Sequence, residues 1–234
     1  MNTTTKVVLA AMLLVSISCK KENNGVQPPQ TGTDLSDMIA GKYAAVRIGT
    51  QNWMLKNLDL THYRNGDRIP QVKDPAKWMN LTTGAWCWYN NDSANGAVYG
   101  KLYNWYAVND PRGLAPEGWH IPSDAEWTTL STFLGGDAVA GGKMKSTGTI
   151  ETGTGLWYAP NTNATNSSGF TGLPGGYRFF NGRFNLIGHY GYWWSSTEYN
   201  TTSAWSHNLT YDDGSDYRFI DNKLGGFSVR CLKD

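Results

Sequence analysis

The side chains best suited to contact a ligand gather toward the C-terminal end of this chain of 234 residues. Tyrosine rings offer flat apolar faces with a hydroxyl at one end, and such faces suit sugar rings as well as protein surfaces. Arginine and aspartate side chains among them can exchange hydrogen bonds with hydroxyl-rich or peptide ligands. We therefore predict a ligand-binding surface made of Arg178, Arg183, Tyr190, Tyr192, Tyr199, Asp212 and Asp213.

The tryptophans of the same region are expected mainly to fill the core, because the sheet around them is short of Leu and Ile. Trp193 and Trp194 are adjacent, so within a strand they point to opposite faces. One of the two is therefore free to face away from the core.

No arrangement typical of catalysis accompanies these residues. The chain has no G-x-S-x-G nucleophile elbow. The glycines of 136–143 resemble a phosphate loop, but their spacing is too long and Met144 stands where Ser or Thr is needed. Glu126 is explained by helix capping rather than by acid–base chemistry. We predict no catalytic residue and no cofactor.

Metal binding is not predicted either. The four histidines, His62, His120, His189 and His207, show no short ligand spacing, and His120 is expected to be a packed core residue. The carboxylates of Asp212, Asp213 and Asp216 surround one turn and could attract Ca²⁺. A solvated hairpin tip favours Asp and Gly for its own geometry, so both interpretations of this turn stay open.

Of the three cysteines, one is predicted to be lipidated and two are predicted to form a disulfide. Cys19 follows the apolar run 7–15 and small residues, as the lipidated cysteine of a bacterial lipoprotein does, although Ser16 occupies the position usually held by Leu. An ordinary signal peptide with a chance cysteine is the alternative. Cys87 and Cys231 then remain, and in an exported chain we predict that they form a disulfide. Such a bond would close a loop of about 145 residues, worth about 4–5 kcal/mol in the chain-entropy model. Two buried free thiols are the alternative.

These features divide the chain into a lipoprotein signal peptide (1–18), a polar flexible tether (19–43) and one domain (44–234). The protein is expected at the bacterial cell envelope as an outer-membrane lipoprotein exposed at the surface. A net charge of +1 with scattered basic residues gives no reason to expect a nucleic-acid partner.

The elements that must position these side chains predict an α+β fold. Ser123 and Glu126 form a capping box that starts a helix over 124–134, and Trp127 on its apolar face should be core. A second helix is expected over 99–107, with Trp105 in the core. Residues 135–172 are expected to form long loops with one helical turn near 142–144. Strands are expected at 176–180, 184–187, 192–195, 204–211, 217–221 and 226–232, with Asp213-Gly214 in a hairpin turn.

Six motifs occur in one order along the chain: WMLKNL at 53–58, YGKLYNW at 99–105, GWHIPSDAEW at 118–127, GGYR at 175–178, WWSST at 193–197 and SVRC at 228–231. Together they resemble the Fibrobacter succinogenes major paralogous domain (FISUMP) family, whose members are exported, often lipidated and mostly of unknown function. The segments 121–127 and 226–230 are also similar to formylglycine-generating enzymes. That wider resemblance implies a C-type-lectin-like fold with a twisted antiparallel sheet, two short helices and long irregular loops.

The wider resemblance does not extend to the chemistry of those enzymes, which work through paired cysteines and copper late in the chain. No cysteine occurs between Ala164 and Arg230, so oxidase activity is not expected. The sequence thus predicts an exported, lipid-anchored, non-catalytic binding module for glycans or proteins. An enzyme with an unrecognised site on the same fold is the alternative.

Overall fold

Helix α4 begins and ends where the capping pattern predicts. In the computed structural model, which describes residues 43–234, it spans Asp124–Phe133. The Ser123 side chain accepts the backbone N–H of Glu126 at 3.3 Å, while the Glu126 carboxylate accepts the backbone N–H of Ser123 at 2.8 Å. Trp127 is buried, so the predicted helix with an aromatic anchor is confirmed. The signal peptide, Cys19 and the tether up to residue 42 lie outside the described residues.

The remaining helices are short. They are α1 (Pro75–Trp78), the 3₁₀ helix η2 (Tyr89–Asn91), α2 (Ser93–Tyr99), α3 (Trp105–Val108) and α5 (Asp137–Met144). The prediction of one helix over 99–107 is wrong, because Gly100 adopts a left-handed φ of 78° and ends α2. A new helix then starts at Trp105, where the Asn104 side chain accepts the backbone N–H of Ala107 at 3.1 Å.

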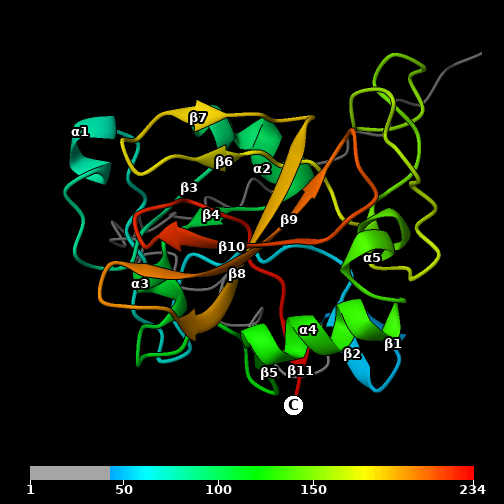
Figure 1. Ribbon diagram of the computed structural model, residues 1–234. Coiled ribbons are helices and arrows are strands. Elements are labelled where there is room, and N and C mark those ends of the chain that lie inside the picture. The colour runs from blue at the N-terminus through cyan, green and yellow to red at the C-terminus, as the bar shows by residue number, and fades with distance from the viewer. Residues whose placement is uncertain (1–42) are drawn as a thin grey trace, which may run out of the picture. The chain divides into compact units, whose positions relative to one another are not determined.

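The described strands form four small sheets whose ladders are antiparallel (Figure 1). One has the order β1-β2-β11-β5, with β1 Ala45–Ile48, β2 Gln51–Met54, β11 Leu232–Lys233 and β5 Trp119–His120. A second has the order β10-β9-β8, with β8 Tyr190–Glu198, β9 Ser203–Thr210 and β10 Tyr217–Asn222. The two-stranded pairs are β3 (Trp86–Cys87) with β4 (Leu102–Tyr103) and β6 (Tyr177–Arg178) with β7 (Phe184–Asn185). The fold is therefore α+β, but its strands are divided among several small sheets.

The segment 226–232 is expected to be one strand, but its first three residues instead link three elements. Gly226 bridges Arg178, Phe227 bridges Tyr103, and Ser228 bridges Trp193. Because each residue pairs with a different element, regular pairing starts only at Leu232 in β11.

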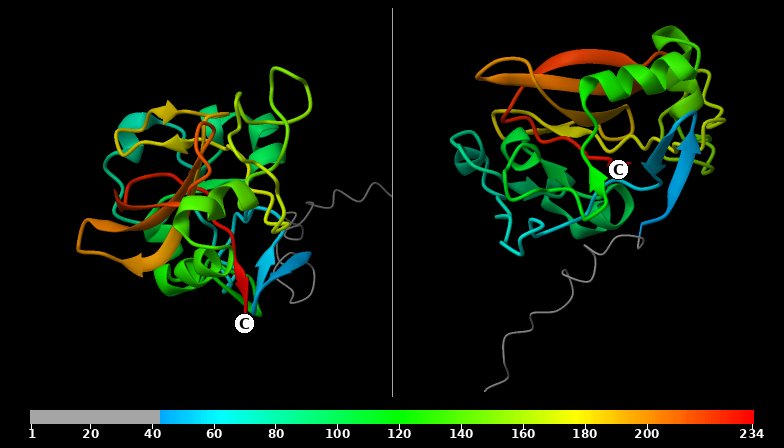
Figure 2. Two further views of the ribbon diagram at one scale, coloured as in Figure 1. Left: turned by 45° about the vertical axis from the view of Figure 1, so that its right-hand side comes forward. Right: turned by 90° about the horizontal axis from the view of Figure 1, so that it is seen from below.

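The three-stranded sheet is covered on both faces over much of β8. In Figure 1 helix α4 lies below this sheet and the β6–β7 ribbon lies above it, and both views of Figure 2 keep α4 against the strands. Trp193 packs with Trp127 in one buried cluster, whereas Trp194 packs with Trp105 in another. Neither indole faces away from the core, which corrects the expectation that one of them could.

The predicted disulfide between Cys87 and Cys231 is not formed. Both residues are free, buried thiols. Cys87 lies in β3 and packs in a cluster with Trp78, whereas Cys231 lies beside β2, where its carbonyl accepts the backbone N–H of Met54. The two thiols are held in separate parts of the core, and burial raises the pKa of the Cys87 thiol to about 12.

Candidate functional site

One face of the β8-β9-β10 sheet collects the tyrosines that the sequence singles out. The register sets Tyr192 of β8 and Tyr217 of β10 on either side of Asn208, and it sets Tyr190 opposite Thr210. Side chains alternate along a strand, so Phe219 and Asp221 follow Tyr217 on the same face. Gly191 lies between Tyr190 and Tyr192, where an added Cβ would sit 2.4 Å from the Trp193 ring.

This face is hollowed into a groove of about 500 Å³, which we call the tyrosine groove. Its walls come from the three strands, from the β9–β10 loop and from the β6–β7 ribbon. The lining residues are Tyr177, Leu186, Tyr190, Tyr192, Asn208, Thr210, Asp212, Asp213, Tyr217 and Phe219.

Ring contacts hold the aromatic walls in place. Tyr177 of β6 meets Tyr192 of β8 edge-on with ring centroids 4.8 Å apart. On β10, Tyr217 and Phe219 stack with centroids 6.1 Å apart, and they are 37% and 44% exposed. The groove thus presents aromatic faces to solvent at positions fixed by the strands.

Four of the seven predicted binding residues come together here: Tyr190, Tyr192, Asp212 and Asp213. Tyr199 is 52% exposed but stands apart, at the far end of β8, where its ring meets that of Trp205 at 5.3 Å. Arg183 is exposed in the turn before β7 and does not line the groove.

Arg178 is a correction, because it is fully buried and cannot belong to a binding surface. Its guanidinium donates to the backbone carbonyl oxygens of Val72 at 2.6 Å, Lys73 at 2.9 Å and Gly182 at 3.0 Å. It also lies over the Trp78 ring, 4.3 Å from the centroid. The side chain joins the 72–78 segment to β6 instead of facing a ligand.

The carboxylates of the β9–β10 loop have separate surroundings. Asp212 is exposed, and Asp213 accepts the backbone N–H of Ser215 at 2.6 Å, so hydrogen bonds from Ser215 lower the pKa of Asp213. Asp216 is buried and points to His207. The three carboxylates do not converge on a calcium site, and residues 43–234 contain no group of three or more metal-ligating side chains.

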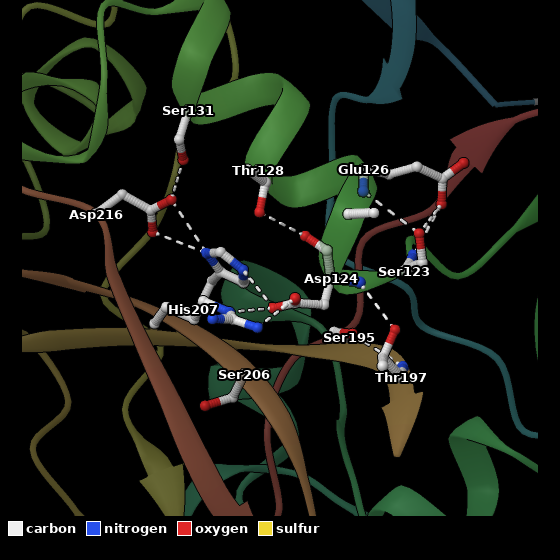
Figure 3. Close-up of polar contacts among 12 residues, drawn as sticks. Ser123, Asp124, Glu126, Thr128, Ser131, Ser195, Thr197, Ser206, His207 and Asp216 are labelled. Atoms are coloured by element: carbon white, nitrogen blue, oxygen red, sulfur yellow. Dashed lines mark hydrogen bonds and ion pairs between the residues drawn. The ribbon is translucent and has the colours of Figure 1, made fainter. Parts of the chain in front are cut away.

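On the opposite face of the same sheet, a buried polar network fastens α4 (Figure 3). The His207 ring lies 3.0 Å from an Asp216 oxygen on one side and 3.8 Å from an Asp124 oxygen on the other. Ser131 donates to Asp216, and Arg218 donates to both oxygens of Asp124. Burial alone would lower the pKa of His207, but the two carboxylates raise it to about 9.

The network has the residue types of a catalytic relay, but His207 is only 3% exposed. Its ring stacks on Trp127, with ring centroids 4.7 Å apart. The arrangement therefore joins helix to sheet. His120 also differs from expectation: it is partly exposed and connects Asp234 at 2.6 Å with Glu126 at 2.9 Å.

Sequence reasoning missed six residues of the groove: Tyr177, Leu186, Asn208, Thr210, Tyr217 and Phe219. Strand alternation alone could have placed Tyr217 and Phe219 on one face, because they are two positions apart. To place them beside Tyr190 and Tyr192, one must also know how β9 pairs with β8 and with β10. The sequence does not determine the second pairing, because a six-residue loop separates β9 from β10.

Comparisons with known proteins place the chain at the level of a family. No curated protein and no solved structure matches it. Within the described residues, none of the helices has the length and apolar character required to cross a membrane. The sequence model of the family described as Fibrobacter succinogenes major domain matches residues 46–233, so this chain belongs to that family.

Proposed function

We propose that this protein is a lipid-anchored, non-catalytic binding module whose tyrosine groove takes a glycan or protein ligand. The observation that carries the proposal is the groove itself, with five aromatic side chains around the polar groups of Asn208, Thr210, Asp212 and Asp213. Aromatic faces with a few oriented polar groups are the usual lining of ligand sites.

The C-type-lectin-like architecture implied by the wider resemblance forms part of this proposal. Supporting it are the α+β organisation and the long loops between α5 and β6, a stretch with isolated bridges and no regular strand or helix. In folds of this kind, ligand contacts are placed on loops and strand faces carried by a rigid core. The tyrosine groove has that position.

The cellular location is proposed from residues 1–43 alone. An apolar segment followed by Cys19 favours export and lipidation, and the polar residues after it favour a tether. An outer-membrane lipoprotein exposed at the cell surface would present the groove to extracellular glycans or proteins.

A pair of substitutions in β10 tests the groove. Phe219 and Ile220 are neighbours and are 44% and 43% exposed, but they lie on opposite faces of the sheet. The full-length protein, in a detergent without a sugar or choline head group, is applied to a glycan array and to envelope proteins. Phe219→Ala and Tyr190→Ala should weaken binding, whereas Ile220→Ala should not. Equal binding by all three variants would refute the groove as the site.

The alternative, an enzyme on the same fold, is separated by a panel of hydrolase substrates. Turnover that disappears in Asp213→Asn but persists in Ile220→Ala would favour that alternative. Binding without turnover supports the module.

A further inference from the structure

A second, smaller pocket opens beside the tyrosine groove and has a different chemistry. Its volume is about 200 Å³, and five aromatic side chains line it: Tyr177, Phe179, Phe180, Tyr192 and Phe227. We call it the aromatic cage. The Tyr177 ring stands edge-on to those of Tyr192 and Phe227, with centroids at 4.8 and 6.0 Å, and the Tyr192 and Phe227 rings meet at 4.8 Å with a tilt of 31°. These contacts hold three of the aromatic walls in place around the pocket.

One carboxylate faces this cage. Asp221 lies at the end of β10, two positions beyond Phe219, and lines the pocket together with Asn222. The Ser206 hydroxyl donates a hydrogen bond to its carboxylate at 2.5 Å. Among residues 43–234 no Lys, Arg or His forms an ion pair with Asp221. Burial without a cationic partner raises the pKa of this carboxyl group.

One cationic side chain, that of Arg178, lines the cage but does not neutralise Asp221. Arg178 borders the pocket, but its guanidinium nitrogens donate to the carbonyl oxygens of Val72, Lys73 and Gly182. The guanidinium packs between the Trp78 and Phe184 rings, with its carbon 4.3 and 4.8 Å from their centroids. Arg178 is therefore not the counter-ion of Asp221.

We propose that the aromatic cage binds a quaternary ammonium group, with Asp221 as its counter-ion. Aromatic faces carry negative electrostatic potential and attract organic cations, most strongly where water is excluded. A quaternary ammonium has no N–H that needs an acceptor, which suits a pocket with aromatic walls and a single carboxylate. A sugar would leave most of its hydroxyls without partners here. Apart from the tyrosine hydroxyls and Arg178, whose donors are already used, the polar side chains of the lining are those of Asp221 and Asn222.

The inference stands without the proposed function of the tyrosine groove. The two pockets share Tyr177 and Tyr192, but Asp221 lines only the cage, and Asp212 lines only the groove. Substituting each aspartate separately therefore distinguishes failure of one proposal from failure of the other.

The test uses three small probes of similar size on the full-length protein: choline, its neutral isostere 3,3-dimethylbutan-1-ol, and n-butylammonium. Affinity is measured by calorimetry, and contact by saturation transfer to the methyl protons. Choline should bind tightest. Asp221→Asn keeps the side-chain shape and should weaken choline binding at least about tenfold, as loss of a desolvated charge partner does. Asp212→Asn, the matched control, should leave choline binding unchanged.

Tyr192→Leu removes a cage wall and should also abolish choline binding, whereas Tyr192→Phe, which keeps the ring, should retain it. The neutral isostere binding as tightly as choline would overturn the proposal, and so would a choline affinity indifferent to Asp221→Asn. Tighter binding of n-butylammonium would assign the pocket to primary amines instead and would equally overturn it.

Discussion

His207 is a charged side chain held inside the molecule, and its charge has a measurable consequence. Its ring lies between the carboxylates of Asp216 and Asp124 and stacks on Trp127. Those carboxylates raise the pKa of His207 to about 9 against the effect of burial, so the ring is an imidazolium at neutral pH. Its positive charge balances negative charge between α4 and the sheet.

The free energy of unfolding should therefore fall as pH rises from about 6.5 to 8. A folded pKa above the unfolded value of about 6.5 gives stabilisation that is complete below 6.5 and is lost as pH approaches 9. One group contributes a slope of at most about 1.4 kcal/mol per pH unit. Denaturant unfolding at several pH values, monitored by tryptophan fluorescence, measures this change in the free energy of unfolding. The predicted range ends at pH 8 because of Lys145, whose pKa burial lowers to about 8. Above that pH, Lys145 makes the free energy of unfolding rise with pH and so opposes the effect of His207.

His207→Gln should flatten this slope. His120→Gln is the matched control. Burial lowers the pKa of His120, but its hydrogen bonds to the carboxylates of Asp234 and Glu126 raise the pKa above the usual value, and its side chain stays 38% exposed. Water screens an exposed pair, so that variant should keep most of the slope. A slope that survives His207→Gln would show that the buried network does not hold the charge.

At the scale of elements, the packing of α4 against the core centres on one side chain, Trp127. Trp127 is 1% exposed and contacts Trp53, Phe170 and Trp193 at centroid distances of 4.8, 5.8 and 6.5 Å. Trp127→Ala should therefore cost about 3–5 kcal/mol of stability, as for other large core truncations. Phe133→Ala, on the same helix but 62% exposed, should change stability little. Denaturant midpoints compare the two, and equal losses would contradict the assigned core face.

The elements that the sequence predicts well are those whose signals are local. The capping box of α4 lies within four residues, and the hairpin strands β8, β9 and β10 follow from alternation and turn residues. The segment 99–107 failed because the apolar spacing of a helix continued across Gly100, whose backbone conformation ended it. The prediction of one strand over 226–232 is wrong because Gly226, Phe227 and Ser228 each pair with a different, distant element.

In the candidate site, too, residues could be predicted from their type, but contacts between distant segments could not. Tyr190, Tyr192, Asp212 and Asp213 were predicted from residue type and do meet in one groove. Arg178 is predicted with them because its guanidinium can hydrogen-bond a ligand, but two of the three carbonyl oxygens that it bonds instead belong to residues more than a hundred positions away. Asp221 was overlooked for the converse reason, since its cage forms only when β6, β8, β10 and the 226–228 segment assemble.

At the scale of the whole molecule, the chain combines a rigid domain with an N-terminal segment whose role is proposed from sequence alone. The domain's buried cysteines, Cys87 and Cys231, are enclosed by the core and are not accessible for lipid attachment. Cys19 is therefore the one cysteine suited to carry an anchor. A lipid at that position would place the groove and the cage at the end of a tether of about twenty-four residues, within reach of ligands near the membrane.

Cys19→Ala should move the protein from the detergent phase to the aqueous phase in detergent partitioning of whole-cell extracts. The physical reason is that acyl chains contribute about 0.8 kcal/mol of membrane binding per buried CH₂, and the substitution removes the thiol that would carry them. Ser16→Leu is the matched control, because it restores the residue that usually stands three positions before a lipidated cysteine and should keep the protein in the detergent phase. Detergent-phase partitioning of Cys19→Ala would show that the membrane attachment, if the protein has one, does not depend on this cysteine, and the proposed location would then have to be abandoned.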